Sequence, residues 1–255
     1  PQDDWRTKLQ FQDWSAPGND VIASRWCSKF KQGVTVDAIK SSGGQLAYWP
    51  SGKDKKNSEI KRGKHQVVAL PAYGEWFLSA DPVAWIIWDL SGGELEAGPK
   101  DHRIKRKMLS IGPTAGATLN LSALMILLDD ESRKKVKLVY KVEGPADMMV
   151  LMSVIPIEQR NEVLVISGAG GATAEVSIQQ SKLLAGLNVA IVPDRDAAGV
   201  SGGLKWAKAL APTCQSVRII ELPFSERDSH GLDLRDFLNG ATEAPVEIEK
   251  VGELW

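Results

Sequence analysis

The chain has 255 residues, 43% of them hydrophobic and 25% charged, and a formal net charge of −1. This length is enough for two domains with sizeable cores, and no apolar run approaches the ~20 residues that a membrane helix requires. The only cysteines are Cys27 and Cys214, whose separation excludes a cysteine zinc module within this chain and suits a reducing compartment.

The front part of the chain is expected to be an antiparallel-leaning α+β region. Its first residues show no signal-peptide pattern and no initiator Met, so we expect an excised piece of a longer chain. Thr35 is expected to cap a short helix over 36–42. Strands are expected at 45–49, 67–71, 84–88 and 106–110, a polar loop at 51–64 and an apolar helix at 119–128.

Tryptophan is concentrated in this front part. Seven of the nine tryptophans precede residue 90. Exposed rings could stack on single-stranded bases, whereas Trp85 and Trp88 lie in an apolar run that favours a core. We expect core packing for most of them.

The rear part alternates strands with helices. Strands are expected at 136–142, 162–167, 188–192 and 215–221, and helices at 148–154 and 203–210. This repeat predicts a parallel sheet with crossover helices, in which ligands bind outside the carboxyl ends of the strands. The glycine-rich turn at 168–171 fits either a backbone cradle for phosphate or a tight strand-to-helix connection.

Acidic residues follow two of these strands. Asp194 and Asp196 are one residue apart in an extended segment, so their carboxylates point the same way. Glu143 at the end of the neighbouring strand could close the other side, with Asp147 one helical turn further on. Carboxylates that leave room for water and phosphate oxygens describe a Mg²⁺ site better than a Zn²⁺ or structural Ca²⁺ site. The alternative is that Asp194 and Asp196 form only a turn and a helix N-cap.

These acidic pieces resemble the motifs of the Toprim domain, the metal-binding fold shared by DnaG-type and phage primases, topoisomerases and some small nucleases. Glu143 followed by Gly144 is similar to the glutamate that ends the first Toprim strand. Asp194-Arg195-Asp196, followed by Ala-Ala-Gly, is similar to the Asp-x-Asp that ends a later strand, as the primase branch often has it. The resemblance covers residues 133–240.

A last acidic element resembles the final Gly-Lys-Asp-x-Asn-Asp-x-Leu element of primases. The chain departs from it with Leu232 in place of the lysine and Arg235 in place of the asparagine. Whether Asp233 or Asp236 faces the metal is left open by this departure.

A basic run in the front part resembles the primase segment in which a lysine before a short strand contacts nucleotide or template phosphates. On that resemblance Lys107 is the residue carried over, and its neighbours Arg103, Lys105 and Arg106 add positive charge that neutralises phosphates. Arg195 is a further candidate for contact with nucleic acid or nucleotide. The alternative for the run is a solvated strand edge that discourages sheet pairing.

The resemblance implies the catalytic core of a DNA primase, which makes short RNA primers on single-stranded DNA by metal-dependent nucleotidyl transfer. It implies an α/β Toprim domain (mostly parallel sheet with flanking helices) at 133–240. A smaller α+β domain at 1–132, which binds nucleic acid or nucleotide, precedes it, and an acidic tail or linker follows at 241–255. The implied catalytic residues are Glu143, Asp194 and Asp196, and the implied ligands of Mg²⁺, or of Mn²⁺ in its place, are Glu143, Asp147, Asp194, Asp196, Asp233 and Asp236. Glu143 could be a metal ligand or the general base.

Charge and context agree with this reading. Lys and Arg exceed Asp and Glu before residue 142, and the reverse holds after it, so a polyanion could lie on the basic front. The expected partners are single-stranded DNA, ribonucleoside triphosphates and a replicative helicase or fused helicase domain, in the cytoplasm of a bacterial or phage-type replication system and away from membranes.

The same residues leave three rival functions open. A Toprim nuclease would use the same carboxylates with water as the nucleophile, and a non-catalytic nucleic-acid-binding subunit would bind DNA without using them. A topoisomerase would need a nucleophilic tyrosine in a separate domain, and Tyr48, Tyr73 and Tyr140 lie in no such setting.

Overall fold

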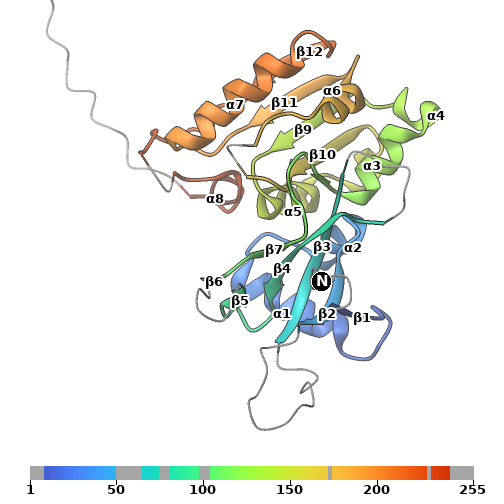
Figure 1. Cartoon of the computed structure of the whole chain (residues 1–255), viewed down its shortest axis with the longest axis vertical. Helices are drawn as coiled ribbons and strands as arrows, with labels where there is room; N and C mark the ends of the chain where they lie inside the picture. The colour runs from blue at the N-terminus through green and yellow to red at the C-terminus, as the bar shows by residue number, and fades with distance from the viewer. Residues whose placement is uncertain are drawn as a thin grey trace, which may run out of the picture.

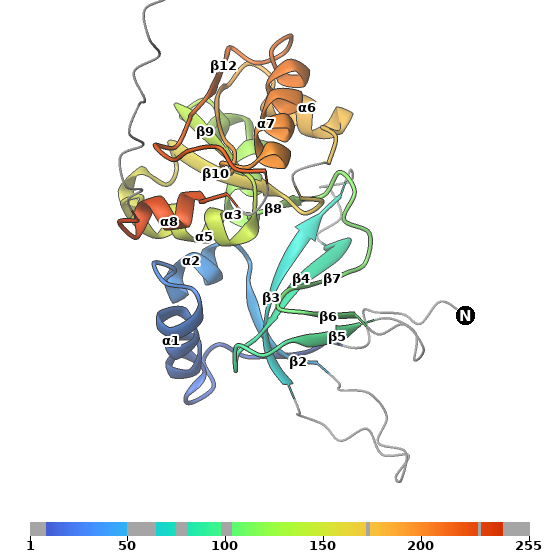
Figure 2. The same ribbon diagram turned by 90° about the vertical axis from the view of Figure 1, so that its left-hand side faces the viewer.

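The computed structural model describes residues 9–49, 65–74, 81–97, 104–171, 174–228 and 231–241. Over these ranges the chain is built around one large mixed sheet with helices on both faces (Figures 1 and 2). The strand order is β1-β2-β3-β8-β10-β9-β11-β12, and β4 and β7 extend the front of the sheet from β3.

The front half of the sheet is antiparallel, as predicted. Its strands are β1 (Gln10–Gln12), β2 (Gln45–Trp49), β3 (His65–Tyr73), β4 (Ala84–Asp89) and β7 (Leu109–Ile111), and a separate ladder pairs β5 (Leu95–Ala97) with β6 (Ile104–Arg106). Helices α1 (Asn19–Phe30) and α2 (Val36–Ser41) pack on one face. The predicted cap of α2 is confirmed, because Thr35 Oγ1 accepts a hydrogen bond from the Ala38 amide at 3.2 Å.

The single strand expected at 106–110 is wrong. β6 ends at Arg106 and β7 begins at Leu109, so Lys107 and Met108 form a bend between two strands. The reason is tertiary: β6 pairs with β5 in the small ladder, whereas β7 pairs with β4 in the main sheet. Lys107 is consequently exposed on the bend.

The rear half of the sheet is parallel, as predicted. Strands β10 (Val163–Gly168), β9 (Leu138–Val142), β11 (Asn188–Val192) and β12 (Ser216–Ile219) pair in parallel. One face carries α5 (Pro145–Val154) and α8 (Leu234–Leu238), and the other carries α3 (Leu121–Leu128), α6 (Ile178–Leu184) and α7 (Ala197–Leu210), with α4 (Asp130–Arg133) and the 3-10 helix Ile157–Gln159 as connections (Figure 2).

Several boundaries of the rear half differ from expectation, and helix α5 begins at Pro145 rather than at 148. Helix α7 begins at Ala197 rather than at 203, because Asp196 caps it. The turn at 168–171 does not open a helix: Gly168 ends β10, and α6 begins only at Ile178 after the capping residue Ser177.

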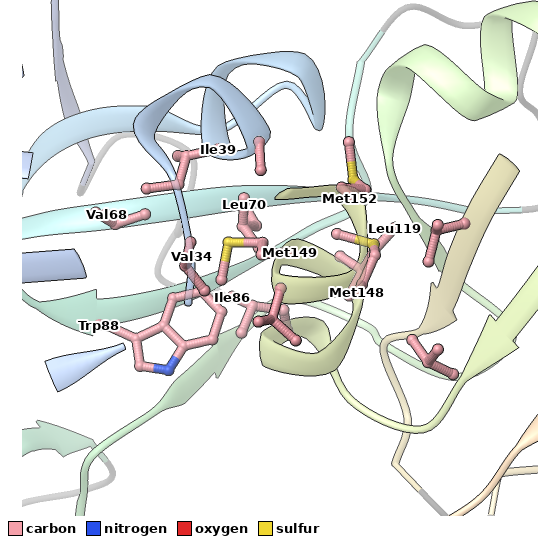
Figure 3. Close-up of a cluster of buried hydrophobic side chains, with 14 of the residues drawn as sticks. Val34, Ile39, Val68, Leu70, Ile86, Trp88, Leu119, Met148, Met149 and Met152 are labelled. Carbon is pink, nitrogen blue, oxygen red and sulfur yellow. The ribbon is translucent and has the colours of Figure 1, made fainter. Parts of the chain in front are cut away.

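Strand β8 (Thr118–Leu119) joins the two halves. It pairs antiparallel with β3 on one side and with β10 on the other. The hydrophobic core is shared in the same way, since Met148 and Met149 of α5 are fully buried in one cluster with Ile39 of α2 and Leu70 of β3 (Figure 3). The expected division at 132/133 therefore falls inside one continuous sheet and one shared core.

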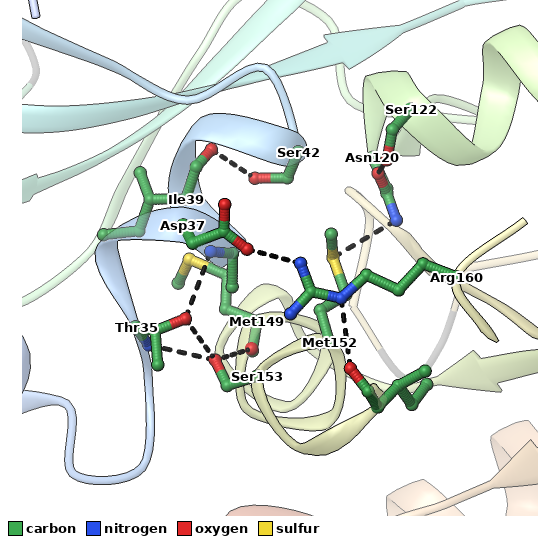
Figure 4. Close-up of polar contacts among 12 residues, drawn as sticks. Thr35, Asp37, Ile39, Ser42, Asn120, Ser122, Met149, Met152, Ser153 and Arg160 are labelled. Atoms are coloured by element: carbon green, nitrogen blue, oxygen red, sulfur yellow. Dashed lines mark hydrogen bonds and ion pairs between the residues drawn. The ribbon is translucent and has the colours of Figure 1, made fainter. Parts of the chain in front are cut away.

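Polar contacts also hold α2 against α5 (Figure 4). The Thr35 amide donates to Ser153 Oγ at 2.9 Å, and this hydroxyl donates to the Met149 carbonyl at 2.7 Å. Arg160 forms an ion pair with Asp37 at the start of α2. The orientation of the front half relative to the rear half is thus fixed by hydrogen bonds as well as by the core.

Core packing is confirmed for four tryptophans, which are all buried: Trp26, Trp85, Trp88 and Trp206. Within the described part of the chain, no helix combines the length and the apolar character that crossing a membrane requires.

Exchanging Gly33 for alanine is expected to destabilise the fold by about 3 kcal/mol. Gly33 has φ +85°, and a Cβ there would lie 2.6 Å from Val150 Cγ2 of α5. Gly18 has a similar φ of +88° with nothing within 4 Å of a Cβ, so Gly18→Ala isolates the backbone strain, about 1 kcal/mol. Urea unfolding of both variants measures the difference, and equal losses would contradict the close approach of the two halves.

Candidate active site

Carboxylates from separate parts of the chain converge at the carboxyl edge of the parallel sheet. Glu143 directly follows β9, and Asp194 lies just beyond β11, whose last residue pairs with the last residue of β9. Asp147 lies in the first turn of α5. Asp233 caps α8, which packs against α5. We refer to Glu143, Asp147, Asp194 and Asp233 as the carboxylate cluster.

Hydrogen bonds from backbone amides and one ion pair hold the cluster together. Glu143 Oε2 accepts a hydrogen bond from the Asp194 amide at 3.3 Å. The buried Asp147 accepts one at Oδ1 from the Arg235 amide at 3.4 Å. Asp233 Oδ2 forms an ion pair with the Arg235 guanidinium at 2.9 Å. The ends of β9 and β11 and the start of α8 are therefore linked through acidic side chains.

Burial and mutual repulsion raise the pKa values of the cluster. Burial, followed by the charges of Asp147 and Glu143, raises the pKa of Asp194 to about 9. Burial and then the charge of Asp233 raise the pKa of Asp147 to about 7. Burial also raises the pKa of Glu143 and of Asp233. These shifts mean that a cation near the cluster would stabilise its ionised form.

The donor chemistry of the cluster fits Mg²⁺. Its side chains offer only carboxylate oxygens, the ligands that Mg²⁺ prefers, and burial and the neighbouring carboxylates disfavour the ionised form of Asp194. As they stand, no three His, Cys, Asp or Glu side chains of the described residues are grouped closely enough to hold a metal ion. Metal binding at this edge is accordingly a proposal.

The other two candidate ligands act as helix caps. Asp196 Oδ1 accepts a hydrogen bond from the Gly199 amide at 2.8 Å and so caps α7. Asp236 Oδ2 accepts from the Asp233 amide at 3.0 Å, in a capping box at the start of α8. The charge of Asp233 raises the pKa of both Asp147 and Asp194, whereas Asp236 acts on Asp233 alone among them. Of the two acidic residues of α8, Asp233 is therefore the one whose charge acts on Asp147 and Asp194.

The predicted basic residues are only partly gathered near the cluster. Arg106 and Lys107 are exposed, and the charge of Lys107 acts on Lys31, the lysine described below. Arg195 donates from Nε to the Phe224 carbonyl at 3.0 Å, which commits part of its guanidinium to the fold. Arg103 lies outside the described residues, and for Lys105 the structure describes only the backbone in β6.

Lys31 is a cationic residue of the site that the sequence did not point to. It follows the last residue of α1, and its Nζ lies 5.5 Å from the centroid of the Trp88 ring. Burial and then the charge of Arg235 lower its pKa, while the charges of Asp147 and Asp233 act in the opposite sense. A lysine of the front half thus stands beside the carboxylates of the rear half, where it could neutralise a phosphate.

A pocket of about 440 Å³ opens next to these cations. It lies between the end of α1 and α8, with Lys29, Phe30 and Gln32 on one wall and Arg235 and Asn239 on the other. Its charged and amide groups suit a polar, anionic ligand more than an apolar one.

Comparisons with known proteins identify the fold. No protein-family model matches the chain, and no curated protein matches it. Among solved structures, the zinc-binding and RNA polymerase domains of the Aquifex aeolicus primase align over 88% of this chain, with 15% identity and a TM-score of 0.52. The chain has the fold of a primase core. The alignment covers 53% of the Aquifex chain, so the present chain spans about half the length of that primase structure.

Two further primase structures are similar to this primase-fold chain. A DNA primase domain from Pseudomonas aeruginosa aligns over 81% of this chain and 64% of its own, with 18% identity and a TM-score of 0.49. A chain from the bacteriophage T7 complex, in which the lagging-strand DNA polymerase interacts with primase domains bound to an RNA/DNA hybrid and dTTP, aligns over 81% and 82%, with 16% identity and a TM-score of 0.44.

Proposed function

We propose that this chain is the catalytic core of a DNA primase, which joins ribonucleoside triphosphates into short RNA primers on single-stranded DNA. The observation that carries the proposal is the carboxylate cluster at the carboxyl edge of a primase-fold sheet, facing cationic side chains from the front half. Acidic and basic groups on opposite sides of one site are what a reaction on metal-bound polyphosphates requires.

The cluster would hold Mg²⁺, which Mn²⁺ could replace, through Asp194, Asp147 and Asp233, with Asp196 contributing its free oxygen. The metal would supply positive charge that polarises the phosphates of the incoming nucleotide. Glu143 would be a further ligand or the general base that accepts the proton of the primer 3′-hydroxyl. Burial raises its pKa, which brings a carboxylate closer to the range useful for a base at neutral pH.

The cations of the site would position the triphosphate and the template. Arg235 lines the pocket between α1 and α8, and Lys31 is close enough to the cluster for the charges of Asp147 and Asp233 to act on it, so the two would neutralise the phosphates of a nucleotide held between the pocket and the cluster. Lys107 on its exposed bend, with Arg106, Lys105 and Arg103 before it, would hold template or triphosphate. Arg195 would contribute only through the donors that Phe224 leaves free.

The setting of this activity would be replication of a bacterial or phage type in the cytoplasm. A replicative helicase, in a separate or fused domain, is the partner we propose, as the resemblance to primases implies.

The test is incorporation of labelled ribonucleotides on single-stranded DNA with Mg²⁺ or Mn²⁺, while the length of the template is followed. Short oligoribonucleotides that depend on template, metal and Glu143 support the proposal. Cutting of the template with the same dependence would establish a nuclease instead. DNA binding that is unchanged in Glu143→Gln, without either activity, would establish a non-catalytic binding subunit.

Exchanging Lys31 for glutamine is expected to raise the KM for the ribonucleoside triphosphate about tenfold, with a smaller effect on kcat. The reason is the loss of one charge–phosphate contact, worth about 1.5 kcal/mol. Lys182→Gln, an exposed lysine of α6 on the other face of the sheet, is the matched control and should change KM less than threefold. Steady-state primer synthesis measures both, and equal effects of the two variants would remove Lys31 from the site.

A further inference from the structure

A lysine is buried beneath the carboxylate cluster. Lys141 is the second-last residue of β9 and is 5% exposed, although lysine is rarely buried to this degree without a partner. It precedes Glu143 by two residues, so the two side chains leave the chain on the same face of the strand. Both line a cavity of about 10 Å³, enough for roughly one water molecule.

The ammonium of Lys141 is held against an aromatic ring. Its Nζ lies 4.6 Å from the centroid of the Trp206 ring, on the buried side of α7. An ammonium at this distance from an indole face is attracted by the ring electrons, and more strongly where water is excluded. The ring therefore fixes the position of the ammonium.

The charges that act on Lys141 are those of the cluster. Burial lowers its pKa to about 8, and the charges of Glu143, Asp194 and Asp147 oppose this change, in decreasing order. Glu143 is thus the carboxylate whose charge acts most strongly on Lys141.

Helix α7 closes the other side of the Glu143 carboxylate. The cavity is also lined by Gly199, Gly202 and Gly203, the glycines of α7 that face the sheet. A Cβ at Gly199 would lie 2.7 Å from Glu143 Oε2. The Glu143 carboxylate therefore occupies space that only a glycine leaves open, beside the cavity that Lys141 also lines.

We propose that Lys141 is a positioning residue: from across the shared cavity, and without a direct ion pair, its ammonium acts as a resident counter-cation that keeps Glu143 beneath α7 and stabilises the carboxylate cluster when no metal is bound. Lys141 takes no part in bond formation. The inference rests on the proposed metal-dependent function of the cluster, but its first test is independent of metal and of activity.

That first test is a double-mutant cycle in the metal-free protein, followed by thermal unfolding in EDTA. Lys141→Met keeps the length and apolar stem of the side chain and removes the charge. It is expected to lower Tm by about 5 °C in the wild-type background and by less than half of that in the Glu143→Gln background. Lys205→Met, an exposed lysine of α7, is the control and should lower neither.

Equal losses of Tm in both backgrounds would overturn the proposal and make Lys141 a packing residue. If Lys141→Met alone does not fold, Glu143→Gln must restore folding to the double variant, and failure to do so would equally overturn it.

The second test is Mg²⁺ binding by titration calorimetry. Without the resident charge the cluster attracts a cation more strongly, so Lys141→Met is expected to bind Mg²⁺ about tenfold more tightly than the wild type. Mg²⁺ should also raise the Tm of this variant more than that of the wild type. Unchanged or weaker binding would contradict the proposal. A wild-type protein that binds no Mg²⁺ would instead refute the proposed function, while the cycle in EDTA still decides on Lys141.

Discussion

Asp194→Asn is expected to lower primer synthesis about a thousandfold while raising the stability of the metal-free protein. Loss of a metal ligand removes several kcal/mol of charge stabilisation in the transition state, and about 1.4 kcal/mol corresponds to tenfold in rate. The gain in stability has a separate cause: burial and the neighbouring carboxylates raise the pKa of Asp194 to about 9, so its ionised form is disfavoured in the fold. Asparagine removes that charge at nearly constant volume.

The two effects are measured by ribonucleotide incorporation and by thermal unfolding in EDTA. Asp130→Asn is the matched control, because Asp130 is an exposed aspartate in the first turn of α4 and should leave both quantities nearly unchanged. A variant that is inactive and also less stable than the wild type would indicate that Asp194 has a structural role, and the assignment to the active site would be wrong.

The stability of the metal-free protein is expected to fall as the pH rises from about 5 to 9, with a loss in Tm of about 5–10 °C. The pKa values of Asp147 and Asp194 are raised from 3.8 to about 7 and about 9 in the folded protein. Between the unfolded and the folded pKa values, the folded state binds more protons than the unfolded state. The contribution of Asp147 and Asp194 to the stability is therefore fully present below pH 4. It is lost as the pH passes through 7 and 9.

Mg²⁺ should reverse this trend, because a cation favours the ionised carboxylates. Thermal unfolding between pH 5 and 9, with EDTA or with Mg²⁺, tests both statements. In Asp194→Asn the slope above pH 7 should be much smaller than in the wild type. A stability that rises with pH in EDTA would contradict the raised pKa values of Asp147 and Asp194.

The sequence predicted those parts of the site that depend on local order along the chain. The apolar run at 188–192 is β11 at those bounds, and the βα order placed Glu143 and Asp194 on the carboxyl edge of neighbouring parallel strands. Thr35 was recognised as a helix cap from its own hydroxyl and the helix that follows. Such features need only a few adjacent residues, so a single sequence carries them.

The sequence failed where distant segments compete for the same residues. The run at 106–110 predicts one strand. In the structure it contributes to two ladders, because β6 pairs with β5 and β7 pairs with β4. The alternating pattern of the strand predicts an exposed polar position at Lys141. In the structure Lys141 is buried, because Trp206 of α7 covers it.

By itself, the sequence determined the parallel order of the rear strands, the edge at which their acidic residues lie, and the oxygen-only chemistry of that edge. Tertiary structure alone decided that the charge of Asp233 rather than that of Asp236 acts on Asp147 and Asp194, and that Lys31 reaches the cluster from α1. The physical reason is range. Secondary structure follows from side chains that are neighbours in the sequence. The electrostatic interactions of a residue depend instead on all the charges packed within a few ångströms of it. Those charges come together only when the two halves pack around a shared core.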